Sequence, residues 1–180
     1  MKHWIRIISS LILLWAVYMG ESCAQPKTIS SIWSFNGIGL GYEHTMDDRS
    51  FIQAEMRSEL TEVFINRKGR VGATASFTWN IVFAQRVSAN GNTVRFYAGP
   101  GAIAGMAPDR KASSGGIFGI KGRVGAECTF DRHVSLSAGF APVIGMHTSI
   151  RNDVINMRLY RNGLIYGLMP EVSIKYAFGR

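Results

Sequence analysis

The sequence predicts an all-β protein that folds as an eight-stranded antiparallel up-and-down β-barrel. Three observations predict this fold class. From residue 31 to residue 178, apolar and polar residues alternate, as side chains do on the two faces of a strand. Polar or glycine-rich segments interrupt the alternation at intervals typical of turns. No sustained helical period of 3.6 residues occurs between them.

Seven strands follow directly from the alternation. In chain order they are Gly37–His44, Phe51–Phe64, Val71–Phe83, Val94–Met106, Gly116–Phe130, Val134–His147 and Tyr166–Phe178. The segments between them, 45–50, 66–69, 90–92, 107–115, 131–133 and 148–163, are polar or rich in glycine and are predicted to be connections. The longest of these, 148–163, is also basic.

An eighth strand is needed, because an up-and-down barrel with both termini at one end has an even number of strands. The apolar phase changes from odd to even positions at Asn36-Gly37, a strong hairpin signal, and this predicts a first strand over 28–35. A β-bulge at the same place is an alternative explanation. Dividing 154–178 into two strands would also supply the count.

The length of 180 residues indicates one domain behind an export signal. Lys2 and Arg6 precede an apolar stretch over 7–17, and Ser22-Cys23-Ala24 resembles a signal-peptidase cleavage site. We therefore expect residues 1–24 to be removed and residues 25–180 to form the barrel. Lipidation of Cys23 is the alternative, although Glu21 is atypical for it.

The composition of residues 25–180 excludes several classes of protein. Their net charge is +7, from 18 basic and 11 acidic residues. The basic residues are scattered and are not grouped with stacking aromatics, which argues against nucleic-acid binding. Cys128 is the one remaining cysteine, and no His or Cys cluster has metal-ligand spacing. We expect no metal, no cofactor and a monomer.

The polar phase of the strands is predicted to face the barrel interior. Glycine and serine are concentrated on this phase, and a narrow eight-stranded barrel has little internal room for side chains. Its charges have mixed signs, and buried charges persist only when paired. We therefore predict an internal network of ion pairs made by Glu55, Arg57, Glu59, Lys121, Arg123, Glu127, Glu171 and Lys175. The alternative is a secreted soluble barrel or sandwich, with this face in water.

The last strand carries a family resemblance. Val172, Ile174, Tyr176 and Phe178 share one face, and aromatic residues close the strand just before the terminus. This segment resembles the final strand of small bacterial outer-membrane barrels of the OmpA/OmpX type, although Gly179 and Arg180 follow Phe178. The resemblance implies a non-enzymatic integral protein of a Gram-negative outer membrane. Its implied partners are membrane lipid, lipopolysaccharide and the barrel-assembly machinery, which reads this strand.

One short motif permits an enzymatic alternative. His147 and Ser149 lie two residues apart on the same face, at the end of a predicted strand that leads into the long polar connection, and Asp153 is a nearby acid. The pair resembles the His-x-Ser motif of outer-membrane lipid A deacylases. In that family a glutamate follows about a dozen residues later and an asparagine follows the serine, whereas Ile150 stands at that second position here.

Two further sets of residues are predicted to lie near the membrane surface. Guanidinium and ammonium groups in the connections could pair with lipopolysaccharide phosphates, and these belong to Arg110, Lys111, Arg151, Arg158 and Arg161. Aromatic residues could form girdles at the membrane interfaces, namely Trp33, Tyr42, Trp79, Tyr97, Tyr160, Tyr166 and Tyr176.

Overall fold

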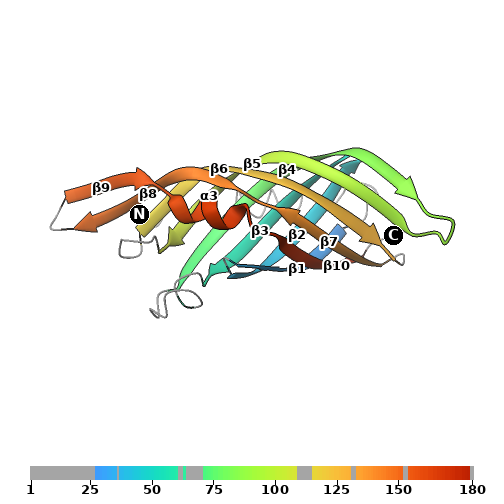
Figure 1. The fold of residues 1–180 in the computed structure, drawn as a ribbon, viewed down its shortest axis with the longest axis horizontal. Coiled ribbons are helices and arrows are strands. Elements are labelled where there is room, and N and C mark those ends of the chain that lie inside the picture. Colours follow the sequence, from blue (N-terminus) through green and yellow to red (C-terminus); the bar gives the residue numbers. More distant parts are fainter. Residues whose placement is uncertain are drawn as a thin grey trace, which may run out of the picture.

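The computed structural model describes residues 27–35, 37–60, 63, 71–108, 115–130, 133–151 and 154–178. All strand pairs in this part of the chain are antiparallel, and one short helix lies in the wall (Figure 1). The strands are β1 (Lys27–Ser34), β2 (Gly37–Asp47), β3 (Ser50–Glu59), β4 (Gly72–Val87), β5 (Thr93–Ala107), β6 (Gly115–Thr129), β7 (Val134–Phe140), β8 (Val143–Arg151), β9 (Val154–Leu159) and β10 (Glu171–Phe178). The helix is α3 (Arg161–Gly167).

These elements form a closed barrel with eight strand positions around its wall, and two of these positions each hold two strands in succession. β7 and β8 follow one another in a single position, since both pair with β6. β9 and β10 share the next position, since β9 pairs with β8 and β10 pairs with β7. β10 also pairs with β1, which closes the sheet. The predicted eight-stranded antiparallel barrel is therefore confirmed.

The register determines how wide the barrel is. Paired residues traced from Ala126 of β6 through β7, β10, β1, β2, β3, β4 and β5 return to β6 at Gly116, an offset of 126 − 116 = 10 residues. For eight strands this offset gives a tilt of roughly 40° and a radius of about 8 Å. Glycine is required where the interior is filled: a Cβ on Gly125 would lie 2.8 Å from the Tyr97 hydroxyl oxygen.

The first strand is confirmed as a separate strand. β1 pairs along its whole length with β2 on one side and with β10 on the other. The change of phase at Asn36-Gly37 is therefore a hairpin connection and not a bulge. Bulges occur elsewhere: the β2–β3 register shifts between Thr45 and Asp47, and the β4–β5 register shifts between Val82 and Ala84.

The predicted strand Val134–His147 is wrong as one continuous element. It is interrupted at Ala141-Pro142, because proline has no N–H to donate to the ladder. The wall stays hydrogen-bonded around the break, since the Gly122 N–H donates to the Pro142 carbonyl and the Ala141 N–H donates to the Gly167 carbonyl, both at 2.9 Å.

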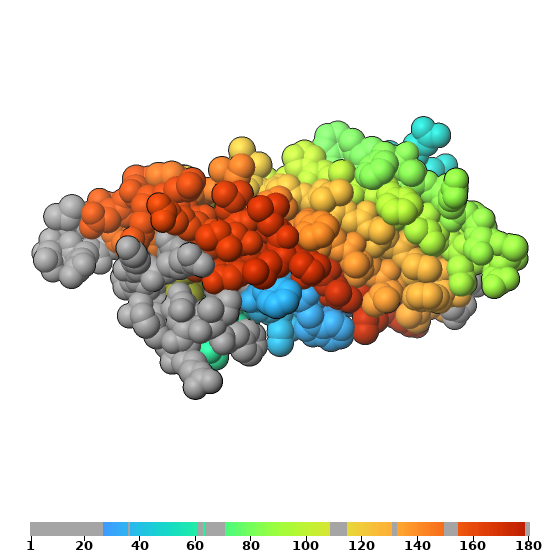
Figure 2. Space-filling view, in the orientation of Figure 1, coloured from blue at the N-terminus to red at the C-terminus, as the bar shows by residue number. Residues whose placement is uncertain are grey.

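Two predictions for the segment 148–178 are wrong. The expected polar connection 148–163 contains the end of β8, all of β9 and the start of α3, and the expected strand Tyr166–Phe178 begins only at Glu171. Leu164, Ile165 and Leu168 have helical spacing, and Pro170 follows α3. Figure 2 shows α3 and β10, in red, lying between the orange surface of β7 and β8 and the blue surface of β1 and β2.

The two ends of the barrel differ in their connections. β1 begins and β10 ends at one end of the barrel, where Lys27 pairs with Phe178, and the short connections 48–49, 88–92 and 130–133 lie at this same end. In the second turn Gly91 has a φ of +81°, which explains the Asn-Gly hairpin signal. The strand ends joined by residues 60–71 and 108–114 lie at the opposite end. The predicted strand Phe51–Phe64 is too long, because β3 ends at Glu59 and the Val63 N–H donates to the Leu60 carbonyl at 2.9 Å. The predicted end at Phe64 itself lies outside the described residues.

Candidate functional site

The wall has one apolar face and one polar face, and the polar face points inward. On β4, Phe77 and Trp79 are 48% and 50% exposed, whereas Thr78 and Asn80 between them are 2% and 0% exposed. The same alternation runs through β1, β2, β3 and β10. Large apolar side chains therefore cover the outside of the barrel, while carboxylates and cations fill its interior.

The face assignment predicts a result for arginine substitutions on β4. Phe77 is outward in the part of β4 that pairs with both β3 and β5. In a bilayer, Phe77→Arg should lower the free energy of unfolding by roughly 2 to 4 kcal/mol, measured by urea titration in lipid vesicles. Val87→Arg, at the exposed end of β4, is the control and should cost roughly 0 to 1 kcal/mol. Equal costs would contradict the assignment.

One cluster of interior charges lies near the end of the barrel at which β1 begins and β10 ends. In this lower cluster, made of Glu43, Arg95, Glu127 and Lys175, each cation contacts both carboxylates. The Arg95 guanidinium lies 2.5 Å from Glu43 and 2.9 Å from Glu127. The Lys175 ammonium lies 2.7 Å from Glu43 and 2.5 Å from Glu127. The four residues come from β2, β5, β6 and β10, so these ion pairs cross the lumen.

A second cluster lies higher in the barrel. This upper cluster consists of Glu55, Arg57, Lys121, Arg123 and Glu171. Arg57 lies 2.6 Å from Glu55 and 2.7 Å from Glu171. Lys121 lies 2.8 Å from Glu55, and Arg123 lies 3.0 Å from Glu171. Arg123 also lies 3.9 Å from Glu55, so Glu55 contacts three cations and Glu171 contacts two.

Aromatic rings lie beside the charges and fill the remaining space. The buried rings of Phe51 and Tyr97 meet edge to face at 5.2 Å. The Arg95 guanidinium lies 4.7 Å from the centroid of Phe51, and the Lys175 ammonium lies 5.4 Å from both rings. Arg123 donates a hydrogen bond to Gln53 and lies 5.8 Å from Tyr97. These contacts link the two clusters.

Glu59 differs from the other interior carboxylates. It is buried, and one oxygen accepts a hydrogen bond from the Thr74 hydroxyl at 3.2 Å, but among the described residues it has no ion pair. Together, the two clusters and Glu59 contain five carboxylates and five cations: Glu43, Glu55, Glu59, Glu127 and Glu171 against Arg57, Arg95, Lys121, Arg123 and Lys175. The formal charges of these ten residues therefore sum to zero.

All eight residues of the predicted charge network point into the interior, and seven of them form ion pairs there. The predicted network omits Glu43 and Arg95, which complete the lower cluster. Arg95 is on the inward phase of β5, but the glycines and alanines of that segment weaken its apolar alternation. The alternation of Val94, Phe96 and Ala98 was the signal that could have found it.

An apolar cluster closes the interior above the upper cluster. It is formed by Ile103, Ala107, Ile117, Val143 and Tyr160. His147 lies here, fully buried, with its Nε2 3.0 Å from the Ala107 carbonyl oxygen and its ring stacked on Tyr160 at 6.4 Å. From α3, Asn162 donates to the Pro108 carbonyl at 3.1 Å. These bonds tie α3 and β8 to the end of β5.

The residues of the enzymatic alternative therefore lie inside the barrel. His147 and Ser149 are both buried on the inward face of β8, and Asp153 lies outside the described residues. The His147 Nε2 contacts a backbone carbonyl, and no bond joins it to the Ser149 hydroxyl within the part of the chain that the structure describes. Nor do the described side chains include a group of three or more potential metal ligands.

Three residues predicted for the aromatic girdles are on the wrong face. Trp33, Tyr42, Trp79 and Tyr176 are exposed on the outside of the wall. Tyr97, Tyr160 and Tyr166 are buried, because the first two lie on the inward phase and Tyr166 lies on the inner face of α3. These three tyrosines fill space inside the barrel.

Only some of the residues predicted to contact lipopolysaccharide phosphates lie among the described residues. Arg110 and Lys111 lie outside the described residues, and the side chain of Arg151 is not described. Arg158 is half-buried, and its partner across the ladder is the inward-facing His147. Arg161 is exposed at the first position of α3.

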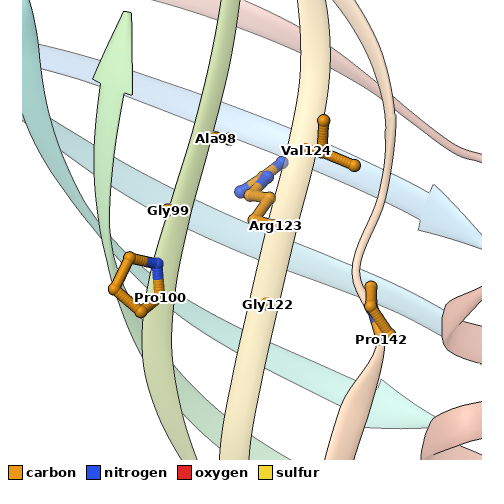
Figure 3. Close-up of a pocket in the computed structure, with 7 residues that line it drawn as sticks. All are labelled: Ala98, Gly99, Pro100, Gly122, Arg123, Val124 and Pro142. Carbon is orange, nitrogen blue, oxygen red and sulfur yellow. The ribbon is translucent and has the colours of Figure 1, made fainter.

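The outer face has hollows where small residues and proline replace large side chains. One, of about 460 Å³, lies over the interruption between β7 and β8 and is lined by Pro100 and Gly122 beside Pro142 (Figure 3). A second, of about 600 Å³, lies higher along β5, β6 and β8. Both hollows open on the outside of the barrel, so they are surface grooves.

Comparisons with known proteins add little to this description. No protein-family model and no curated protein matches the chain. Among solved structures, the chain is similar to Ail, the attachment invasion locus protein of Yersinia pestis, in a crystal structure with the heparin analogue sucrose octasulfate. The identity is 10%, over 86% of this chain and 95% of that chain, with a TM-score of 0.30. No helix within the described residues is long and apolar enough to cross a membrane.

Proposed function

We propose that this chain is a non-enzymatic integral β-barrel protein of the outer membrane of a Gram-negative bacterium, with a structural or surface-interaction role. The observation that carries the proposal is the inverted distribution of side chains. Outward residues such as Leu40, Met56 and Ile120 are more than 60% exposed, while ion-paired charges are buried. This arrangement is stable where the surroundings of the barrel are apolar.

Further features support particular parts of the proposal. The basic n-region and apolar stretch of residues 1–24 support export, with a mature chain that starts at residue 25. The aromatic end of β10 supports recognition by the barrel-assembly machinery. The ion-paired interior and the apolar cluster above it support a role other than that of an open channel. We further propose that the barrel is monomeric and that lipopolysaccharide surrounds its outer half.

Fractionation combined with gel mobility tests the proposal. The protein should be found in the outer-membrane fraction, and unboiled samples should migrate differently from boiled samples, because an intact barrel resists denaturation by detergent. Mass measurement of the mature chain should show a start at Gln25. Recovery of all the protein from the soluble periplasm, with no heat-dependent mobility, would contradict the proposal and would favour a secreted soluble barrel.

The enzymatic alternative leads to a separate prediction. A lipid acyl chain outside the wall cannot reach His147 or Ser149, since both side chains are buried on the inner face. We therefore expect lipid A from cells that express the folded protein to have an unchanged mass spectrum. Release of an acyl chain by the wild-type protein, with loss of that release in both His147→Ala and Ser149→Ala, would show instead that the pair is catalytic.

A further inference from the structure

Helix α3 places a cation on the apolar outer face of the barrel. Its buried residues are Asn162, Gly163, Tyr166 and Gly167. Its exposed residues are Arg161, Leu164 and Ile165, and the C-cap residue Leu168 is also exposed; these four have the spacing i, i+3, i+4 and i+7 of a single helix face. Arg161 therefore shares its outward face with three large apolar side chains. Among the described residues it has no ion pair that would neutralise it.

Arg161 lies below the rim of the barrel. The Tyr160 N–H donates to the Gly145 carbonyl at 2.9 Å, and the neighbouring Leu159 pairs with Met146. Gly145 pairs with Gly119, which is four residues from the start of β6 at Gly115, and this corresponds to about 10 Å along the barrel axis for strands tilted by roughly 40°. A cation at this depth on a lipid-facing surface is costly unless it has an anionic partner.

An apolar groove adjoins this position. It has a volume of about 600 Å³ and is lined on the outer face by Ala102, Phe118, Ile120, Ile144, Met146 and Leu159. Two glycines that face each other across the β6–β8 pair, Gly119 and Gly145, also line it. Gly145 accepts the hydrogen bond that fixes the start of α3, and Leu159 precedes Arg161 by two residues. The groove and the start of α3, which carries Arg161, are therefore neighbours.

We propose that this groove and Arg161 together bind one molecule of lipid A from the outer leaflet. The groove holds an acyl chain, and the guanidinium donates hydrogen bonds to a phosphate oxygen, a pairing for which its fork geometry is well suited. The inference rests on the proposed membrane location. The site is in the half of the barrel away from the start of β1, the end of β10 and the short turns, and that half faces the outer leaflet in barrels of this kind.

Native mass spectrometry of the mature protein, purified in neutral detergent with added lipid A, tests the site. Arg161→Gln removes the cation, and Ala102→Phe fills the groove from an exposed position. Each should reduce bound lipid A about ten-fold or more. The matched controls are Arg86→Gln on the exposed end of β4 and Ala75→Phe on the outward face of β4 outside the groove; both should bind as the wild type does.

The choice of added lipid identifies the ligand. Dephosphorylated lipid A should bind wild type about as weakly as lipid A binds Arg161→Gln, because it lacks the phosphate that the guanidinium contacts, and phosphatidylglycerol is added as the competing phospholipid. Equal lipid A binding by wild type and Arg161→Gln would overturn the proposal, as would preferential binding of phosphatidylglycerol. Heat-dependent gel mobility is checked for every variant. If the wild type shows no heat-dependent mobility, the proposed membrane barrel is contradicted. If a variant keeps this mobility but loses lipid binding, the barrel is intact and the result concerns the lipid site alone.

Discussion

Deletion of residues 176–180 should leave the protein unable to insert stably into a membrane. The deletion removes the last three residues of β10, which pair with Lys27, Thr28 and Ile29 of β1. It also removes the contacts of Ala177 with His133 at the β6–β7 turn. Each backbone group left unpaired in hydrocarbon costs several kcal/mol, so the closing seam of the barrel would open. The measurement is the fraction of heat-modifiable, protease-resistant protein in the membrane.

Deletion of Gly179 and Arg180 alone is the matched control. Neither residue belongs to β10, so this shorter truncation should insert normally. Phe178→Ala keeps the ladder but removes the terminal aromatic side chain, and it should slow insertion without preventing it. A heat-modifiable, protease-resistant barrel formed by the five-residue truncation would show that β10 does not close the wall.

Glu55→Gln should lower the free energy of unfolding by about 3 to 5 kcal/mol, the usual cost of removing one partner from a buried ion pair. Glu55 contacts Arg57 at 2.6 Å and Lys121 at 2.8 Å. The substitution keeps the size of the side chain but leaves the Lys121 ammonium without a carboxylate, in an interior where it is 3% exposed. Urea unfolding in lipid vesicles, followed by gel mobility, measures the change.

Glu59→Gln is the control for this prediction. The substitution is the same, and position 59 is also buried on β3, but Glu59 has no ion pair among the described residues. The amide oxygen of glutamine can still accept the hydrogen bond from Thr74. We expect a cost below about 1.5 kcal/mol, comparable to one hydrogen bond. Similar losses at positions 55 and 59 would contradict the view that ion pairing holds the interior together.

Most of the wall could be predicted because one physical property, burial on a single face, repeats every two residues. On β4 the apolar positions from Val71 to Phe83 are exposed outward, and the polar positions between them are buried or half-buried. The hairpin between β1 and β2 was also predictable, since a change of phase at Asn36-Gly37 has few structural explanations. Partners across the lumen were harder to predict, because alternation shows that Glu43 and Lys175 face inward but not that they meet.

The segment after β8 shows where alternation fails. Seven residues of helix interrupt the last wall position, and a helix this short provides only two turns of periodicity for a sequence to display. Its stability comes from tertiary contacts, such as the hydrogen bond from Asn162 to the Pro108 carbonyl. These two residues are 54 positions apart in the sequence, so local periodicity gives no sign of the contact. The buried tyrosines were misplaced for a related reason, since aromatic residues suit both a membrane interface and a packed interior.

Tryptophan fluorescence tests most directly whether the apolar face of the barrel contacts lipid. Trp4 and Trp15 lie in the predicted leader, so the mature chain contains only Trp33 and Trp79, which are 43% and 50% exposed on the outer face. In vesicles whose acyl chains carry bromine, the emission should be strongly quenched, while aqueous acrylamide should quench it weakly. Strong quenching by acrylamide with no effect of the brominated chains would contradict the account.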